Sequence, residues 1–160
     1  MKRMKRPAAR TPAELLRFLG ERIKAKDLDG IVALQEPEAA IVNFDQSVVR
    51  GREAIRAFYV EWFKSDPVLT VDVLQTEVFG GKRAWWNGKV RGRTATLMGK
   101  YALEQTGADG SRESFNGDFC DTVKEQSNGT WLYLIDNPYP PHDMEAPGSG
   151  HGEHGHHGER

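Results

Sequence analysis

The sequence predicts an α+β domain in which three N-terminal helices pack on one face of a curved, mostly antiparallel sheet. Residues 11–63 carry most of the apolar side chains at helical spacing, whereas residues 69–136 show alternation with a period of two, broken by turn signals. Helices followed by a run of strands are typical of α+β domains. We expect one domain, residues 11–139, between a basic disordered leader at 1–10 and a disordered His/Gly-rich tail at 140–160.

Three helices are expected, each with its own start or stop signal. The first begins at residues 11–14 (Thr-Pro-Ala-Glu), where a hydroxyl N-cap, a proline and a glutamate form a capping box. The second begins at Asp27, because a carboxylate suits an N-cap. The third runs from about Arg52 to Ser65, and Pro67 ends it because proline cannot continue a helix.

The sheet is expected to begin near residues 39–44 and to resume after the third helix. A strand from Leu69 to Phe79 leads to a hairpin turn at Gly80-Gly81 and a return strand over 83–96. Further strands are expected over the ranges 98–105, 112–125 and 131–136. The last of these follows an Asn-Gly turn, a strong hairpin signal.

Basic residues alternate with small ones along the predicted return strand. Lys89, Arg91 and Arg93 therefore share one face of it. We expect this face to be a solvated outer surface or a dimer contact, since long basic side chains commonly cover exposed sheet. Alternatively, these side chains bind a carboxylate or a phosphate.

Composition excludes several classes of function. Charged residues make up 28% of the chain and the formal net charge is −1, so no charge imbalance favours a nucleic-acid partner. No apolar run is long enough to span a bilayer, and no apolar segment follows the basic N-terminus, so neither a membrane partner nor a secretory signal is expected. The single cysteine, Cys120, is consistent with a reducing compartment, and we predict a cytoplasmic location.

All five histidines lie beyond the last predicted strand, at positions 142, 151, 154, 156 and 157. Acid–base chemistry in the domain must therefore use carboxylates, tyrosine, lysine or cysteine unless the tail folds back. We predict no cofactor. His151, His154, His156 and His157 alternate with glycine and glutamate, and either bind a divalent metal loosely or form a plain tail.

Two segments, 27–34 (Asp-Leu-Asp-Gly-Ile-Val-Ala-Leu) and 51–59 (Gly-Arg-Glu-Ala-Ile-Arg-Ala-Phe-Tyr), resemble the ketosteroid isomerase branch of the nuclear transport factor 2-like superfamily. That superfamily also holds the SnoaL-like polyketide cyclases. Residues 128–131 and 136–139 resemble its C-terminal signature. The resemblance implies a cone-shaped, cystatin-like fold, a pocket for a small apolar or polycyclic ligand, and a homodimer. It also implies cofactor-free isomerase-type or lyase-type proton transfer.

Asp121 is the predicted acid or oxyanion donor. Phe119, Asp121 and Val123 share one face of their strand, and a carboxyl between two apolar neighbours on a core-facing side is desolvated. Desolvation favours the neutral acid and raises its pKa. The resemblance also puts Asp121 close to the family's oxyanion-binding aspartate. If the two faces are reversed, Asp121 faces solvent instead.

The resemblance aligns the family's base aspartate with Asn43, and an amide cannot abstract a proton. We predict Asp45 as the base, with Asn43 orienting the substrate if the strand continues; the alternative is a turn at Asp45. The family's oxyanion tyrosine aligns with Leu19, whereas Tyr59 matches a second family tyrosine. Tyr59 and Trp86 are predicted to contact the ligand, or else to be core or interface. Three functions stay open: catalysis, a non-catalytic ligand-binding or assembly module that has lost the base, or metal handling through the histidine-rich tail.

Overall fold

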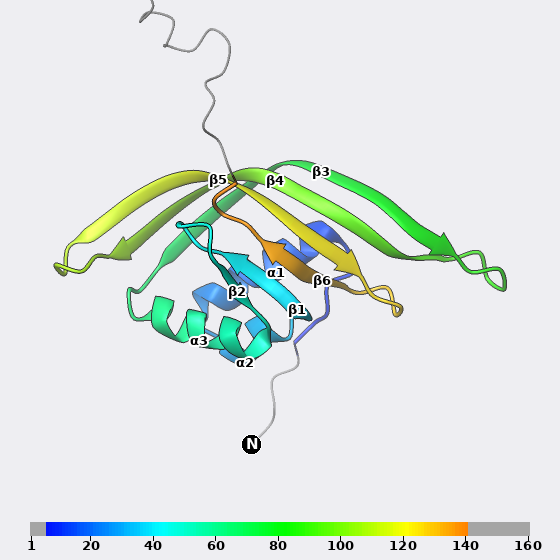
Figure 1. Ribbon diagram of the computed structural model, residues 1–160, viewed down its shortest axis with the longest axis horizontal. Coiled ribbons are helices and arrows are strands. Elements are labelled where there is room, and N and C mark those ends of the chain that lie inside the picture. The colour runs from blue at the N-terminus through cyan, green and yellow to red at the C-terminus, as the bar shows by residue number, and fades with distance from the viewer. Residues whose placement is uncertain (1–5, 141–160) are drawn as a thin grey trace, which may run out of the picture.

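Three helices cover one face of a six-stranded sheet, which confirms the predicted α+β class (Figure 1). The computed structural model describes residues 6–140. The helices are α1 (Pro12–Lys24), α2 (Leu28–Val32) and α3 (Arg52–Phe63). The strands are β1 (Gln35–Val42), β2 (Val48–Arg50), β3 (Val68–Arg83), β4 (Val90–Thr106), β5 (Arg112–Glu125) and β6 (Trp131–Asp136).

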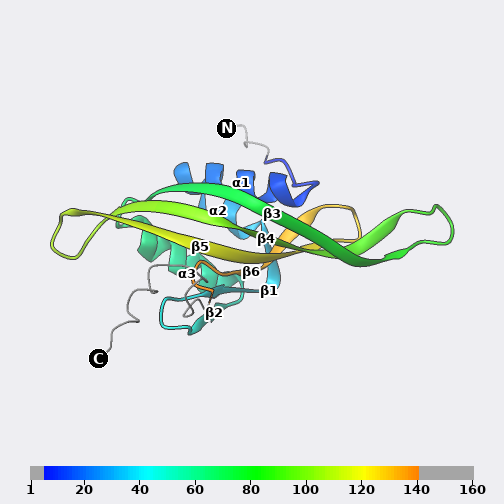
Figure 2. The same cartoon turned by 90° about the horizontal axis from the view of Figure 1, so that it is seen from above.

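The strands lie in the order β2-β1-β6-β5-β4-β3. Only the β1–β6 pair is parallel, so the sheet is mostly antiparallel, as predicted. The long strands β3, β4 and β5 arch over the helices, and Figure 2 shows the helices lying to the sides of this arch. The concave face of the sheet is therefore the face that the helices cover.

The expected helix caps are present. The Thr11 hydroxyl accepts a hydrogen bond from the Glu14 backbone N–H at 3.0 Å, and the Glu14 carboxylate accepts one from the Arg10 N–H at 2.8 Å. The Asp27 carboxylate accepts one from the Gly30 N–H at 3.1 Å. These bonds satisfy donors that have no partner inside a helix. The core between helices and sheet includes the fully buried Leu15, Ile31, Ile55, Leu97, Val123, Trp131 and Tyr133.

The hairpin between β3 and β4 lies farther along the chain than predicted. β3 continues through Gly80 and Gly81, which have φ of 78° and 91°, and the turn is formed by residues 84–89. Gly88, with φ of 70°, supplies the left-handed backbone that the turn requires. β4 then runs as one strand from Val90 to Thr106, so the predicted break near residue 97 was wrong.

Residues 6–10 belong to the packed domain, which corrects the expected disorder of this part of the leader. The Arg6 guanidinium forms two bonds of 2.7 Å with the Asp27 carboxylate. Ala9 is buried, and its carbonyl accepts a hydrogen bond from the Trp131 N–H at 2.9 Å. Residues 1–5 and the predicted tail from 141 onward, with all five histidines, lie outside the described residues.

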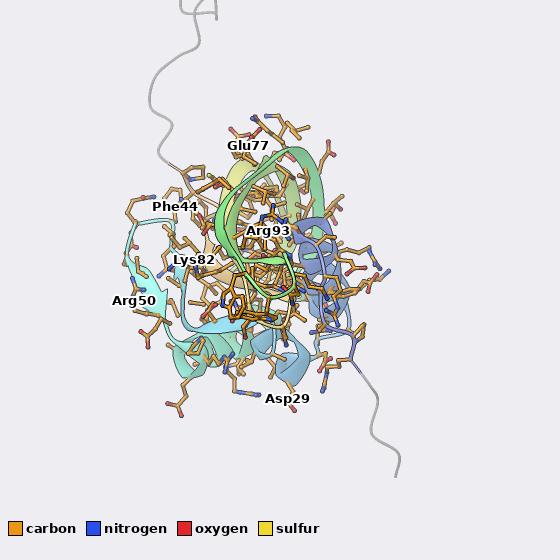
Figure 3. The ribbon with its side chains drawn as sticks, turned by 90° about the vertical axis from the view of Figure 1, so that its right-hand side faces the viewer. Asp29, Phe44, Arg50, Glu77, Lys82 and Arg93 are labelled. Carbon is orange, nitrogen blue, oxygen red and sulfur yellow. The ribbon has the colours of Figure 1, made fainter. Side chains whose placement is uncertain are left out.

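Arg91 and Arg93 lie on the concave face, not on the outer face that the alternation suggested. The Arg93 guanidinium forms two bonds of 2.8 Å with the Glu125 carboxylate and lies 5.6 Å from the centre of the Trp131 ring. Arg91 lies 3.9 Å from the same carboxylate. Figure 3 shows Arg93 inside the curve of the ribbon and Glu77 at its outer margin. The face was misjudged because long basic side chains were expected to face solvent, although Arg93 shares a face of β4 with the buried Ala95 and Leu97.

Candidate functional site

A cavity of about 1190 Å³ opens between the helices and the concave face of the sheet. Its wall is largely aromatic and aliphatic, which suits an apolar ligand. The apolar and aromatic lining residues include Leu16, Leu19, Ile23, Phe58, Tyr59, Trp62, Leu69, Val71, Tyr101, Phe115, Phe119 and Tyr139. Leu19 is thus a wall residue at the position where the resemblance expects an oxyanion tyrosine.

Asp121 is the buried carboxyl of this cavity. Only 4% of the residue is exposed, and its neighbours on the same face of β5, Phe119 and Val123, are buried too. Its Oδ1 accepts a hydrogen bond from the Asn137 N–H at 2.8 Å. Burial, followed by the charge of Asp136, raises the pKa of Asp121 well above its usual value, which favours the neutral form of this carboxyl.

Asp136, at the end of β6, is the partner of Asp121 in this cavity. The two carboxyls are hydrogen bonded to each other, and burial raises the pKa of Asp136 to about 6. Two hydrogen-bonded carboxyls titrate as a pair, and one of them must hold a proton to donate the bond. Within residues 6–140, neither carboxyl has an ion-pair partner and no lysine or arginine lines the cavity.

A β-bulge in β6 explains why Asp136 points inward. Val123 pairs with Tyr133 but Thr122 pairs with Ile135, so Leu134 is an extra residue in β6. The bond from the Cys120 N–H to the Asn137 carbonyl continues the shifted register and sets Asp136 opposite Asp121. Strict alternation from the buried Tyr133 would have turned Asp136 outward. No local pattern in residues 131–136 indicates the bulge, so Asp136 was missed as a site residue.

Tyr59, on α3, lines the cavity and is only 2% exposed. Burial raises its pKa, and the nearby carboxyls Asp136 and Asp121 raise it further. Its hydroxyl forms no hydrogen bond with any residue in the described range, so the group is available to a ligand. The hydroxyl of Tyr133, buried beside the same two carboxyls, also has no partner among residues 6–140.

The two residues predicted to form the base and its support lie in a turn. β1 ends at Val42, so the strand continuation that was to place Asn43 and Asp45 on one face is absent. The Asp45 Oδ1 accepts hydrogen bonds from the Ser47 Oγ at 2.6 Å and from the Ser47 N–H at 2.9 Å. These bonds lower the pKa of Asp45, which is exposed. Both residues border the cavity, with Asp45 on its solvent-facing side.

Trp86 lies outside the cavity, contrary to the sequence-based expectation. It belongs to the turn of residues 84–89, is 69% exposed, and packs edge-on against Trp85 with ring centres 5.8 Å apart. This turn ends the β3–β4 arm, defined here as residues 79–94, which extends beyond the body of the domain (Figure 1). The misplacement follows from the predicted turn at Gly80-Gly81, which assigned Trp86 to a strand.

Residues 6–140 contain no group of three side chains that could hold a metal ion. Within the same residues, no helix is both long enough and apolar enough to cross a membrane.

The fold and the cavity define a class of protein: a helix-covered, curved sheet of the nuclear transport factor 2-like, cystatin-like type. The SnoaL-like domain family matches residues 15–131, and the chain belongs to that family. No curated protein matches the chain.

Solved structures show the same fold at low sequence identity. A nuclear transport factor 2-like superfamily protein from Salmonella enterica is 16% identical, with a TM-score of 0.62 over 86% of this chain and 92% of that one. A protein of unknown function from Mycobacterium tuberculosis is 21% identical, with a TM-score of 0.60 over 78% and 70%. A nuclear transport factor 2-like protein with a cystatin-like fold from Novosphingobium aromaticivorans is 15% identical, with a TM-score of 0.58 over 77% and 75%.

Proposed function

We propose that the chain binds a small, largely apolar molecule in this cavity and catalyses cofactor-free proton transfer on it, as an isomerase or a lyase. The observation that supports this proposal is the pair of carboxyls, Asp121 and Asp136, that share a proton in an apolar cavity. Two titratable groups whose pKa values are pushed apart by their environment are suited to act as acid and base. The SnoaL-like family membership agrees with this class of function.

Asp136 takes the role of base in this proposal, in place of Asp45. Its pKa of about 6 leaves it ionised at pH 7 yet basic enough to accept a proton. Asp45 is a weaker base because the hydrogen bonds from Ser47 lower its pKa. Asp121, whose pKa is raised by burial, donates a hydrogen bond or its proton to a carbonyl or hydroxyl oxygen of the substrate. Asn43 and Tyr59 contact the ligand.

The proton balance closes for both reaction types. In an isomerisation, Asp136 takes a proton from a carbon next to a carbonyl and returns it to another carbon, while Asp121 stabilises the enolate oxygen. In a dehydration, Asp136 takes a carbon-bound proton and Asp121 gives its proton to the departing hydroxyl, which leaves as water. The proton then moves from Asp136 to Asp121 along their hydrogen bond, which restores the starting state.

The proposal is tested by proton exchange on a model ketone. In D₂O at pH 7.5, the protein should accelerate the exchange of the α-protons of 2-tetralone, followed by NMR. General-base catalysis contributes roughly 10²- to 10⁴-fold, so Asp136→Asn should reduce the acceleration by at least about 10². Asp109→Asn, which also removes one carboxylate but in the turn between β4 and β5, should leave the rate unchanged.

Two results would contradict the catalytic proposal. An exchange rate that Asp136→Asn leaves intact but Asp45→Asn abolishes would restore Asp45 as the base. Binding of 2-tetralone without any accelerated exchange would favour a non-catalytic ligand-binding module.

We also infer a homodimer formed through the outer face of the sheet. Alternation along the strands puts Met98 and Cys120, which pair with each other, on the face opposite the buried Leu97 and Asp121. None of the described helices covers this face (Figure 2). Phe79, opposite Thr94 on the same outer face, is 56% exposed. Sedimentation equilibrium should give twice the mass of the chain, and Met98→Lys should shift the protein to monomer; a monomeric wild-type protein at 100 μM would contradict the inference.

A further inference from the structure

The carboxyl pair Asp121–Asp136 lacks a positively charged partner. The other buried carboxyl of the domain, Glu125, is bound by the guanidinium of Arg93. No lysine or arginine within residues 6–140 forms an ion pair with Asp121 or Asp136. Burying a carboxylate without a counter-charge costs several kcal/mol in general, and such groups are normally paired.

The other charged side chains of the cavity wall are acidic as well. Asp45 lies at its open side, and no basic side chain of the described chain borders it. Asp118, which the cavity also touches, is bound at 2.9 Å by Lys100, whose side chain is 66% exposed. The electrostatic potential inside the cavity is therefore negative, and the low dielectric of an apolar wall strengthens it.

Tyr59 provides a second, independent indication of a ligand. Only 2% of the residue is exposed, and it lines the cavity. Its hydroxyl has no hydrogen-bond partner in the described part of the chain. The Tyr59 hydroxyl is not among the fully enclosed unpartnered atoms of the described chain, so it is open to the cavity, where it can donate a hydrogen bond to a ligand or accept one from it. Its charge interactions with Asp136 and Asp121 place this hydroxyl near the pair.

We propose that the cavity selects a hydrophobic ligand that carries a protonated amine, and that the ammonium group binds at Asp136 and Asp121 beside the Tyr59 hydroxyl. The inference rests on the part of the proposed function that makes the cavity the ligand site, and it names the chemical class of the ligand. While an ammonium group is paired with Asp136, this carboxylate is not free to act as the base, so the inference concerns binding and not turnover.

The chemistry of an ammonium group matches this end of the cavity. It offers three N–H donors, and the oxygens of Asp136, Asp121 and Tyr59 can accept them. Its charge compensates the carboxylate that the protein leaves unpaired. The faces of Tyr59, Trp62 and Phe119 line the same cavity, and aromatic faces attract cations. A ligand with a carboxylate or phosphate would instead meet repulsion from a wall that offers it no cation.

The size of the cavity allows the apolar part to be a ring system. Its volume of about 1190 Å³ is slightly above the range of roughly 300–1,000 Å³ found for small-molecule pockets. An aromatic amine of one or two rings therefore fits, with room for a larger one.

The inference is tested with three ligands of nearly equal shape and different charge. Isothermal titration calorimetry at pH 7.5 compares 1-naphthylmethylamine, 1-naphthalenemethanol and 1-naphthoic acid. The amine should bind at least about 10-fold more tightly than the alcohol, and the acid at least about 10-fold more weakly than the alcohol. Asp136→Asn should remove the advantage of the amine and leave the affinity for the alcohol within about 3-fold.

Controls separate a specific site from general attraction to negative charge. Asp109→Asn removes one exposed carboxylate in the β4–β5 turn and should leave all three affinities unchanged. Asp136→Ser is a second variant at the site, used if Asp136→Asn does not fold, and it too should remove the advantage of the amine.

The outcomes distinguish the inference from the proposed function. Equal affinities for amine and alcohol, or an amine advantage that survives both site variants, would overturn the inference while the cavity remains a ligand site. If none of the three compounds binds, both the inference and the proposed ligand site are overturned.

Discussion

Two buried carboxyl sites on the same strand, β5, differ in how the protein treats their charge. Glu125 is bound by Arg93 at 2.8 Å, and this hydrogen bond holds the pKa of Glu125 below its usual value. Asp121 faces another carboxyl, Asp136, and burial raises the pKa of both. Asp121 and Glu125 are 4% and 3% exposed, so the partners of the two carboxyls, an arginine and a second carboxyl, are what distinguish the sites.

The comparison separates a structural carboxyl from a functional one. At Glu125 the ionised form is paired, so its charge contributes to stability. At Asp121–Asp136 the ionised form lacks a counter-charge, so the pair reduces stability at neutral pH. Groups that reduce the stability of a fold are characteristic of functional sites.

The largest expected effect is a gain in stability from Asp136→Asn. The folded-state pKa of about 6 exceeds the ordinary aspartate pKa of 3.8, so the wild-type protein loses stability as pH rises from about 4 to about 6. At 1.36 kcal/mol per pKa unit the penalty approaches about 3 kcal/mol, and we expect the variant to gain about 2 kcal/mol at pH 8. Guanidinium unfolding at pH 8 should show this gain, and at pH 4 it should vanish.

Asp109→Asn is the matched control for that gain. Asp109 lies in an exposed turn, and the amide oxygen of the asparagine can accept the same hydrogen bonds from Ser111. Its free energy of unfolding should change by less than about 0.5 kcal/mol. If wild type and Asp136→Asn were equally stable at pH 8, the unpaired charge at Asp121–Asp136 would not reduce stability. The proposed electrostatic difference from Glu125 would then be wrong.

Glu125→Gln should act in the opposite direction. The Glu125 pKa is depressed, so its stabilising contribution is present at neutral pH and disappears as pH falls below about 4. The Arg93 side chain is 38% exposed, and water replaces part of the lost interaction, so we expect a loss of about 1–2 kcal/mol at pH 7. Urea unfolding measures it, and Glu104→Gln, an exposed strand glutamate, is the control. A loss that persists undiminished at pH 3 would contradict the electrostatic explanation.

Tyr59→Phe should have little effect on the free energy of unfolding and should weaken ligand binding. The hydroxyl has no protein partner in the described chain, so its removal should change the free energy of unfolding by less than about 1 kcal/mol. One lost hydrogen bond of about 1 kcal/mol predicts roughly 5-fold weaker binding of 1-naphthylmethylamine, measured by calorimetry. Unchanged affinity would show that the hydroxyl does not contact the ammonium group.

The smallest effect is expected for Asp45→Asn. The amide oxygen can accept the same bonds from Ser47, so the free energy of unfolding should change by less than about 0.5 kcal/mol. The exchange rate of 2-tetralone should stay within about 3-fold of wild type. A reduction of the exchange rate by 10-fold or more would indicate that Asp45, and not Asp136, is the base.

The parts of the fold that could be predicted from sequence depend on neighbouring residues. The caps at Thr11 and Asp27 are local bonds, and the inward direction of Asp121 follows from alternation between two apolar neighbours. The turn at 84–89 was missed because Gly80-Gly81 is a turn signal of similar strength, and only pairing across the whole hairpin decides between them.

Other features depend on contacts between distant segments. Arg6 is ordered by Asp27, and no pattern within residues 1–10 reveals that pairing. Asp136 joins the site through the register of β6 against β5, which single-strand alternation cannot supply. Similarly, Arg93 and Glu125 meet only once β4 and β5 have paired.

The bulge at Leu134 makes the presence of the carboxyl pair a matter of strand register. If the same residues paired without the bulge, alternation would bring Ile135 to the cavity in place of Asp136, with no change in composition. Deletion of Leu134 would instead remove the extra residue and leave Asp136 opposite Asp121 in a regular ladder. A lineage could therefore lose the reactive group when this strand pairs without its bulge, while its helices, caps and core persisted.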